Sequence, residues 1–365
     1  MYKRQIKDTA DAVSKSSVEI LGDSDSVTLS DVANAAQGAL INALDKGEDS
    51  TNITFNVKDT AANLAAKATN LDVANVVTVG DSASTELNVA NAGLLNGITN
   101  YDHQGGYTIK DTADAVSKSS VAILGDSDSV TLSDVANAAQ GALINGFDKG
   151  ESTTDITFSV KDTAANLAAN AANLDVANAV TIGDSASTEL NVANAGLLNG
   201  IPNYDNKGAY TIRDTADAVS KSSVEILGDA VSVTLSDVAN AAQGALINGL
   251  DKGESTTDIT FNVEDSATNL AAKAANLDVA EKVSVGSAGD NEVSVADAGL
   301  LNGIANYDHQ GGYTIKDTAD AVSKSSVAIL GDADSVTLSD VANAAQGRSS
   351  MGSIRARAPR ISHLT

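Results

Sequence analysis

The sequence contains no cysteine and no tryptophan, and it has only two prolines, four phenylalanines and seven tyrosines in 365 residues. Without cysteine, the chain can form neither a disulfide framework nor a thiolate metal site. So few large aromatic residues leave the core to alanine, valine, leucine and isoleucine, which is typical of a thin, repetitive protein. No apolar run reaches the length of a membrane-spanning helix, so we expect no membrane insertion.

Positive charge is also scarce, because 23 lysines and arginines face 48 acidic residues and give a formal net charge of −25. Such a chain is repelled by phosphate groups, so nucleic acid is not expected as a partner. No zinc-ligand spacing, phosphate-binding glycine loop or nucleophile motif stands out. A glycan-cleaving enzyme would need one unrepeated acidic pair in a cleft, whereas every carboxylate here sits in a repeated context. The sequence therefore predicts that the protein is not an enzyme.

The dominant feature of the chain is repetition. The segment Lys-Asp-Thr-Ala-Asp-Ala-Val that begins at Lys7 recurs from Lys110, Arg213 and Lys316, 103 residues apart each time. Residues 110–141 and 316–347 agree at 31 of 32 positions. We assign the copies to residues 6–106, 107–209 and 210–312 and a partial copy to 313–347. Residues 1–5 are interpreted as a non-native lead-in, and the basic segment 348–365 as a disordered or foreign tail.

Each copy subdivides into four modules, of which residues 156–174 give the clearest pattern. Apolar and polar residues alternate over 156–160, which predicts a strand with one apolar face. Residues 164–174 place alanine and leucine on one helical face and asparagine on the other. Between the two, Asp162 and Thr163 are residue types that cap the free N–H groups of a helix. One such module buries too little apolar area to be stable alone, so modules must stack.

The fold class that this pattern favours is α/β, in the form of a repetitive strand–helix solenoid. We expect one parallel sheet with the helices on one face and contacts mainly between neighbouring modules. The alternative is a string of tandem β-sandwich domains, because 103 residues is a typical length for an immunoglobulin-like domain. The asparagine and alanine face and the missing aromatic core argue against sandwiches.

Calcium is the one candidate ligand that the composition suggests. The acidic loop Gly22-Asp-Ser-Asp-Ser26 recurs at 125–129 and, with alanine for the first serine, at 331–335. Alternating aspartates can direct oxygen ligands at one hard cation. The competing interpretation is a turn with a solvated acidic loop, and Val231 replaces the second aspartate in the third copy. The candidate calcium ligands are Asp23, Asp25, Asp126, Asp128, Asp332 and Asp334.

Three further sets of residues recur at fixed places in the modules. Aspartates at the ends of the strands are interpreted as helix caps, with an ion-binding ladder as the alternative; they are Asp59, Asp111, Asp134, Asp162, Asp184, Asp214, Asp237, Asp265, Asp317 and Asp340. Threonines form the outward face of the strands, which suits a wet surface and could contact a polysaccharide; they include Thr54, Thr131, Thr157 and Thr234. His103 and His309 are interpreted as loop residues, because the third copy has Asn206 there.

The stretch Lys58-Asp-Thr-Ala-Ala-Asn-Leu-Ala-Ala66, its copy at 161–169 and the later Val-Thr-Val-Gly-Asp81 resemble a known repeat type. Similar strand–Asp-Thr-Ala-Ala-Asn-Leu tandem repeats occur in very large secreted or cell-surface proteins of cyanobacteria and other aquatic bacteria. The resemblance covers about residues 6–347. It implies an extracellular or cell-surface repeat region, often exported by a type I route and often joined to calcium-binding modules.

The function that we predict is therefore structural. The chain is expected to be an adhesin-like repeat region that acts as an extender or as a multivalent display, without catalysis. The alternative is a calcium-binding repeat module of a type I secreted protein. The expected partners are neighbouring repeats of the same chain, with a surface polysaccharide or other cells as candidate targets. As a fragment with exposed ends and sheet edges, the chain is expected to self-associate.

Overall fold

The computed structural model describes residues 4–47, 51–80, 85–150, 154–183, 188–205, 210–253, 257–287 and 289–355. The chain forms two compact units, which are described separately. The first comprises Met1–Asp162, Asn170–Gly183 and Ile201–Asp205, and the second comprises Thr163–Ala169, Asp184–Gly200 and Asn206–Thr365.

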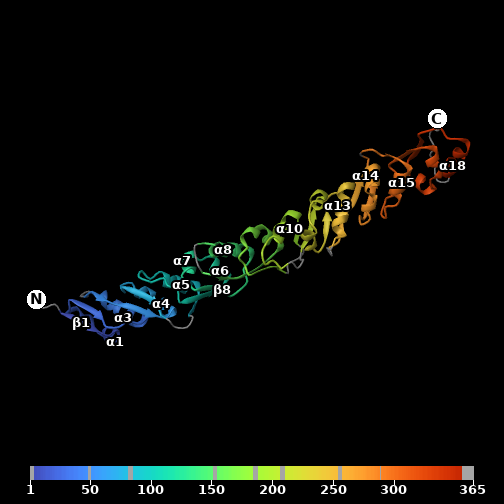
Figure 1. The fold of residues 1–365 in the computed structure, drawn as a ribbon. Coiled ribbons are helices and arrows are strands. Elements are labelled where there is room, and N and C mark those ends of the chain that lie inside the picture. Colours follow the sequence, from blue (N-terminus) through green and yellow to red (C-terminus); the bar gives the residue numbers. More distant parts are fainter. Residues whose placement is uncertain are drawn as a thin grey trace. The chain divides into compact units, whose positions relative to one another are not determined.

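The three complete copies contain the same elements in the same order, and the partial copy begins the series again (Figure 1). The first copy contains β1 (Gln5–Asp8), α1 (Ala10–Ser14), α2 (Val18–Gly22), β2 (Ser26–Leu29), α3 (Ala35–Asp45), β3 (Ile53–Thr54), β4 (Asn56–Asp59), α4 (Ala61–Lys67), η1 (Ala68–Asn70), β5 (Val76–Val79), β6 (Thr85–Leu87) and α5 (Val89–Asn96). The second contains β7 (Tyr107–Asp111), α6 (Ala113–Ser117), α7 (Val121–Leu124), β8 (Ser129–Leu132), α8 (Ala138–Asp148), β9 (Ile156–Thr157), β10 (Ser159–Asp162), α9 (Ala164–Asn170), η2 (Ala171–Asn173), β11 (Ala179–Ile182), β12 (Thr188–Leu190) and α10 (Val192–Asn199).

The third copy contains β13 (Tyr210–Asp214), α11 (Ala216–Ser220), α12 (Val224–Gly228), β14 (Val233–Leu235), α13 (Ala241–Asp251), β15 (Ile259–Thr260), β16 (Asn262–Asp265), α14 (Ala267–Lys273), η3 (Ala274–Asn276), β17 (Lys282–Val285), β18 (Glu292–Val293) and α15 (Val295–Asn302). The partial copy contains β19 (Thr314–Asp317), α16 (Ala319–Lys324), α17 (Val327–Asp332), β20 (Ser335–Leu338) and α18 (Ala344–Arg355).

All strand pairings within the described ranges are parallel, and within each sheet the strands pair in their order along the chain. The first unit holds the sheets β1-β2-β3, β4-β5, β6-β7-β8-β9 and β10-β11, and the second holds β12-β13-β14-β15, β16-β17 and β18-β19-β20. The crossover between paired strands contains one or two helices, so each strand–helix passage forms one coil. The predicted α/β solenoid of parallel strands is confirmed. Tandem β-sandwiches, which are built from antiparallel strands, are excluded as the fold.

The strands form several small sheets where one continuous sheet was expected. Val27 pairs with Ile53, but Ala33 forms an isolated bridge with Val57, so six residues of one coil face four of the next. The mismatch breaks the ladder at Phe55, and β4 then pairs onward with β5. The cause is the unequal length of successive coils, which forces the register to shift.

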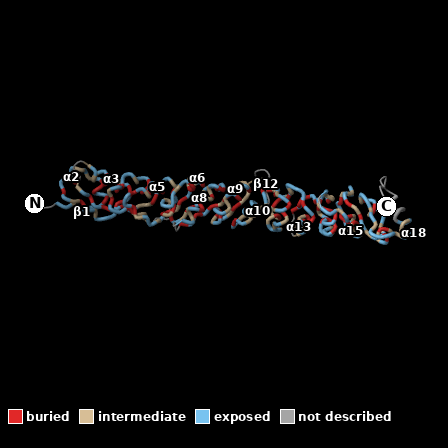
Figure 2. The backbone as a smooth tube through the Cα atoms, turned by 90° about the horizontal axis from the view of Figure 1, so that it is seen from above, coloured by how far each residue is buried: buried red, intermediate tan, exposed pale blue. Residues whose placement is uncertain are grey.

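The core lies between the helices and the inward side chains of the strands. In β4, Val57 is fully buried while Asn56 and Lys58 on either side are exposed, as period-two alternation predicts. Helix α3 contacts β4 of the next coil, and α4 contacts α3 and α5. Buried positions recur in every complete copy in this way (Figure 2). The buried side chains are mainly alanine, valine, leucine and isoleucine, which agrees with the composition.

Glycine allows the helices to approach the strands closely. A Cβ atom added to Gly141 in α8 would lie 2.6 Å from Val160 Cγ2 and 3.0 Å from Leu174 Cδ2. Gly38 and Gly244 occupy the equivalent places over Val57 and Val263. The helix of every complete copy therefore rests on a buried valine at a distance that no larger residue permits.

Residues 156–174 differ from the predicted module in two places, because the strand expected over 156–160 is divided at Phe158 into β9 and β10, and the helix ends earlier than expected. Ile156, Phe158 and Val160 are buried on the strand side, as expected. Helix α9 ends at Asn170, and the predicted last turn is instead the 3-10 turn η2, which brings Leu174 into the core.

Regular structure extends into both terminal segments. Strand β1 begins at Gln5, inside the predicted lead-in, and pairs with β2 at Ser26. Helix α18 continues through residues 348–355, where a disordered or foreign tail was expected. Residues 356–365 lie outside the described ranges. Among the described residues, no helix is both long and apolar enough to span a membrane.

Candidate functional site

The strand-end aspartates join each coil to the coil before it. Asp59 is the last residue of β4, and its Oδ1 atom accepts the backbone N–H of Thr60 at 2.7 Å. Its Oδ2 atom accepts the backbone N–H of Ala35, the first residue of α3, at 2.9 Å. Because the first N–H groups of a helix have no partner within the helix, the carboxylate completes the start of a helix 24 residues earlier. Asp59 is thus a bridge between coils as well as a cap.

The same bridge recurs through both units. Aspartates that accept the first backbone N–H of a helix in the preceding coil are Asp31, Asp111, Asp134, Asp162, Asp214, Asp237, Asp265, Asp317 and Asp340, with donor–acceptor distances of 2.5 to 3.0 Å. Asp184 lies outside the described residues. We call these residues, together with Asp59, the aspartate ladder.

The third copy replaces one member of this series. Ser287 stands where the earlier copies have aspartate, and there the side chain of Asn291 accepts the N–H of Ala267 at 2.9 Å. A neutral amide oxygen therefore serves the same purpose as a carboxylate. This substitution fits a role in capping a helix, because an amide oxygen accepts the same hydrogen bond.

Hydrogen bonding also affects the pKa of Asp59, one member of the aspartate ladder. Partial burial of this carboxyl is the largest single influence and raises its pKa. Hydrogen bonds from the Asn63 side chain and from the backbone N–H groups of Ala35 and Thr60 together outweigh burial, so the pKa of Asp59 is lowered. The ionised form is therefore the form that stabilises the junction between coils.

A second set of links depends on buried asparagines that sequence reasoning missed. Asn42 in α3 is 3% exposed, and its Oδ1 atom accepts the backbone N–H of Val73 at 3.0 Å. Asn145 and Asn248 make the same bond in the later copies. The available signal was Leu-Ile-Asn in each long helix, where a polar residue interrupts the apolar face. Beside each asparagine an exposed ion pair also joins coils; the pairs are Lys46–Asp72, Lys149–Asp175 and Lys252–Asp278.

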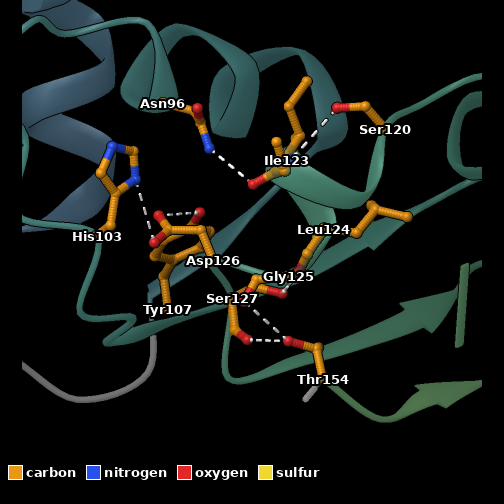
Figure 3. Close-up of polar contacts among 11 residues, drawn as sticks. Asn96, His103, Tyr107, Ser120, Ile123, Leu124, Gly125, Asp126, Ser127 and Thr154 are labelled. Carbon is orange, nitrogen blue, oxygen red and sulfur yellow. Dashed lines mark hydrogen bonds and ion pairs between the residues drawn. The ribbon is translucent and has the colours of Figure 1, made fainter. Parts of the chain in front are cut away.

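The acidic loop of the second copy takes part in a cluster of polar contacts (Figure 3). The side chain of Asp126 is only 4% exposed and lies 3.5 Å from Nδ1 of His103. Its Oδ2 atom accepts the hydroxyl of Tyr107 at 3.1 Å. Burial, followed by the nearby Asp126 carboxylate, raises the pKa of Tyr107, so its hydroxyl keeps its proton and donates. The His103 ring also packs edge-on against Tyr101, with ring centroids 4.7 Å apart.

Asp128 points at a different partner from Asp126. Its Oδ1 atom accepts the backbone N–H of Gly106 at 3.1 Å. Gly105 and Gly106 both have positive φ, and a Cβ at Gly105 would lie 2.5 Å from Asp128 Oδ1. The two aspartates of the motif therefore fasten one loop, residues 103–106, to the next coil by separate contacts.

The partial fourth copy repeats this arrangement. Asp332 accepts the hydroxyl of Tyr313 at 3.2 Å and lies 3.3 Å from His309 Nδ1. Asp334 accepts the N–H of Gly312 at 3.1 Å. The histidines thus take part in the cluster, although the sequence indicated only a loop. The signal that could have revealed them is the recurring run Tyr-Asp-His-Gln-Gly-Gly-Tyr.

In the described residues of the first and third copies, these aspartate contacts are not repeated. In the first copy Asp23 is exposed, Arg4 stands where Tyr107 would be, and the Arg4 N–H donates to Asp25 at 2.7 Å. In the third copy the Tyr210 hydroxyl and Asp229 Oδ2 are buried without a hydrogen-bond partner. Burial, with the charge of Glu225, raises the pKa of Asp229. Asn206 lies outside the described residues.

The six candidate calcium ligands come from the first, second and fourth copies, and the second and fourth copies hold them in the same arrangement. Within the described residues, no group of three or more acidic or histidine side chains is arranged to hold a metal ion. In the second and fourth copies the motif aspartates already accept hydrogen bonds from protein groups. Calcium binding stays a prediction from the sequence.

The threonines of the strands line the face away from the core. Thr54, Thr131, Thr157 and Thr234 are exposed. Parallel register places Thr131 beside Thr157, so threonines of adjacent coils are neighbours. These threonines form a polar, hydroxyl-bearing surface.

Comparison with known proteins gives one informative similarity. No family model matches the chain. Over 224 residues, 58% of its length, the chain is 29% identical to a protein named S-layer protein from Synechocystis sp.. The aligned region spans only 12% of that protein.

Proposed function

We propose that this chain is a structural repeat region of a large cell-surface or secreted bacterial protein, where it acts as an extender and displays the same surface many times without catalysis. The observation that supports the proposal most directly is the aspartate ladder. Carboxylates that recur in every copy accept the backbone hydrogen bonds that join one coil to the next. The repeated hydrogen bonds hold the coils together and are equivalent from copy to copy. Such repetition suits a function that depends on the length of the protein and on the number of its repeats.

The proposed location at the cell surface is supported by the similarity to a protein named S-layer protein. The test is to treat intact cells of the source organism with a protease and to probe for this repeat with a specific antibody. Loss of the antibody signal from intact cells is expected. Protection of the repeat until the cells are lysed would overturn the surface location.

The extender role is tested by removing one whole copy. Deletion of residues 107–209 joins two equivalent positions, so each coil junction has a counterpart in the parent chain. Four coils at a strand spacing of about 4.8 Å correspond to roughly 20 Å. Small-angle scattering measures the maximum dimension of each protein. The maximum dimension of the deletion variant should be smaller than that of the full chain by about 20 Å. An unchanged maximum dimension would contradict an extender.

Adhesion is the finer part of the proposal, with a surface polysaccharide or the surface of another cell as the target. The exposed threonines favour a hydroxyl-rich ligand, because they supply donors and acceptors along neighbouring strands. Soluble chain should compete with cell attachment to the polysaccharide, and the variant Thr131→Lys with Thr157→Lys should compete less. Equal competition by wild type and variant would exclude this surface.

The alternative function is a calcium-binding repeat module. It is favoured by the alternating aspartates Asp126 and Asp128 and by their equivalents in other copies. Thermal unfolding of the full chain with increasing calcium tests it, with magnesium at equal ionic strength as the control. If the chain is a calcium-binding module, calcium should raise the Tm more than magnesium does, and Asp128→Asn should reduce this rise. A structural repeat without calcium requires equal curves in the two salts.

A further inference from the structure

The helices carry an apolar stripe on the side that faces away from the core. In α3, Ala36, Leu40 and Ala43 are exposed, and their spacing places them on one helical face. Leu40 is 55% exposed, and Leu94 on α5 is 47% exposed. Half-exposed leucines on two helices that both contact α4 are more than scattered surface residues.

The stripe recurs in the other complete copies. Leu143 on α8 is 55% exposed and Leu246 on α13 is 58% exposed. Leu197 on α10 and Leu300 on α15 repeat the second position, at 53% and 51%. The chain therefore presents leucine at the same two places in each complete copy. We call these two sets of three residues the outer leucines.

The helices that bear the outer leucines have little charge. Helices α3, α4 and α5 together contain 26 residues, of which only Asp45 and Lys67 are charged. In the whole chain, by contrast, 19% of residues are charged. The charges are concentrated elsewhere, for example at Lys58 and Glu86 on exposed strand positions. Beside α3, the segment of α1 and α2 adds Asp11, Lys15 and Glu19, of which Asp11 and Lys15 pair with each other, so the helix face has few unpaired charges in a protein with a net charge of −25.

We propose that this helix face is the surface through which a second copy of the same chain associates, side against side. Two chains of net charge −25 repel each other, so they can meet closely only where both surfaces have few charges. The helix face meets this condition, and a second copy supplies the same face with few unpaired charges. A second copy supplies the same leucines, and the first unit alone holds Leu40, Leu94 and Leu143, so one alignment of two such units buries several of them together.

The area of the face explains why several copies must take part. A stable interface commonly contains 20 to 30 residues and about 800 Å² on each partner. The exposed apolar residues on α3, α4 and α5 of one copy are too few and too small for this; they are Ala36, Leu40, Ala43, Ala62, Ala66, Ala90 and Leu94. Repetition of the stripe supplies the remaining area, and engagement of several copies at once strengthens weak single contacts.

This inference rests on the proposed function, because lateral association gives an extended surface protein its cohesion. Its mechanism differs from association through exposed sheet edges or chain ends. The two mechanisms involve different residues and can be separated by substitution.

The test uses the full chain and two triple variants of equal charge. In the first variant, Leu40→Glu, Leu143→Glu and Leu246→Glu place three carboxylates on the helix face. The matched control replaces exposed strand residues with the same charge by Thr28→Glu, Thr131→Glu and Thr234→Glu. All six positions are exposed, so both variants are expected to fold, and circular dichroism melts check this.

Sedimentation equilibrium measures association of the three proteins over a range of concentrations. Wild type should associate, and more strongly at 0.5 M than at 0.05 M sodium chloride, because salt screens the repulsion between acidic chains. The leucine variant should associate at least about tenfold more weakly, since burying a carboxylate without a partner is costly. The threonine control should behave like wild type.

Three results would overturn the proposal. Wild type that stays monomeric at high concentration and high salt has no such interface. Equal association of the leucine variant and wild type places the contact at the ends or edges. Equal weakening by both variants attributes the effect to net charge alone. None of these results changes the outcome of the protease experiment on intact cells, so the surface location and the lateral contact can fail independently.

Discussion

The Oδ2 atom of Asp59 accepts the backbone N–H of Ala35 at 2.9 Å, so a carboxylate at the end of one strand completes a helix in the coil before it. Covalent connection runs forward along the chain, whereas this bond runs backward. Each coil is therefore held by a neighbour on both sides.

Replacing the bridging carboxylate should loosen the junction locally. Asp59→Ala removes acceptors from Ala35 and Thr60 and should cost about 1–2 kcal/mol, because hydrogen bonds to a charged group exceed neutral ones. Hydrogen–deuterium exchange of peptides from α3 is the measurement, and faster exchange at its start is expected. Asp11→Ala, which removes only an exposed pair with Lys15, is the control and should change little. Equal exchange in both variants would contradict the bridge.

Acid should weaken the same junction. The pKa of Asp59 is lower in the folded chain than its ordinary value, so the ionised form contributes stability above about pH 4. That contribution is lost as pH falls through the lowered pKa. Asp59→Asn cannot titrate, and its amide oxygen can still accept a hydrogen bond, as Asn291 does for Ala267.

Urea unfolding at several pH values between 7 and 2.5 measures this effect. Other carboxyls with lowered pKa, including Asp72 beside Lys46, also make wild type less stable in acid. The expected result is thus a difference, in which the stability of Asp59→Asn declines less than that of wild type below about pH 4. Parallel declines in the two proteins would show that Asp59 does not take part.

Two glycines in one helix should respond oppositely to alanine. Gly141→Ala brings a Cβ to 2.6 Å from Val160 and should destabilise by about 1–3 kcal/mol, since α8 must move away from the strand. Gly146 has open space around it, so Gly146→Ala should stabilise by about 0.5–1 kcal/mol through helix propensity. Urea unfolding of both variants is the measurement. The same sign for both substitutions would contradict the close approach at Gly141.

Removing the charge of Asp229 should stabilise the third copy. Asp229 is partly buried, its Oδ2 atom has no hydrogen-bond partner, and its pKa is raised. Its ionised form therefore weakens the fold once pH rises above the raised pKa, while the protonated form is tolerated. Asp229→Asn should raise the Tm slightly at pH 7, and the gain should vanish in acid. Asp126→Asn, at the equivalent place with Tyr107 and His103 as partners, should lower the Tm.

Much of the fold could be predicted from the sequence because short local patterns determine each strand and helix, and these patterns repeat. The alternation over residues 156–160 correctly gave a strand with one buried face. The breaks between sheets could not be predicted, because they depend on register between coils of unequal length. No local pattern in the sequence shows that Ala33 will bridge Val57 while Val27 pairs with Ile53.

The polar contacts divide in the same way. Aspartates after strands were expected to cap helices, but the helix that each one completes is in the preceding coil. A bond across 21 to 24 residues cannot be inferred from the spacing of neighbouring residues. Similarly, Asp126 and Asp128 looked like partners because they are close in sequence, yet in the turn between α7 and β8 their side chains contact Tyr107 and Gly106 separately.

The backward reach of the aspartates also bears on how such a gene can change its length. Unequal recombination between two near-identical copies adds or removes 103 residues at equivalent positions. Each new coil then meets a neighbour whose amide group already lies within reach of its carboxylate. Longer and shorter descendants can arise in single genetic steps, with no intermediate that has to evolve a fresh contact.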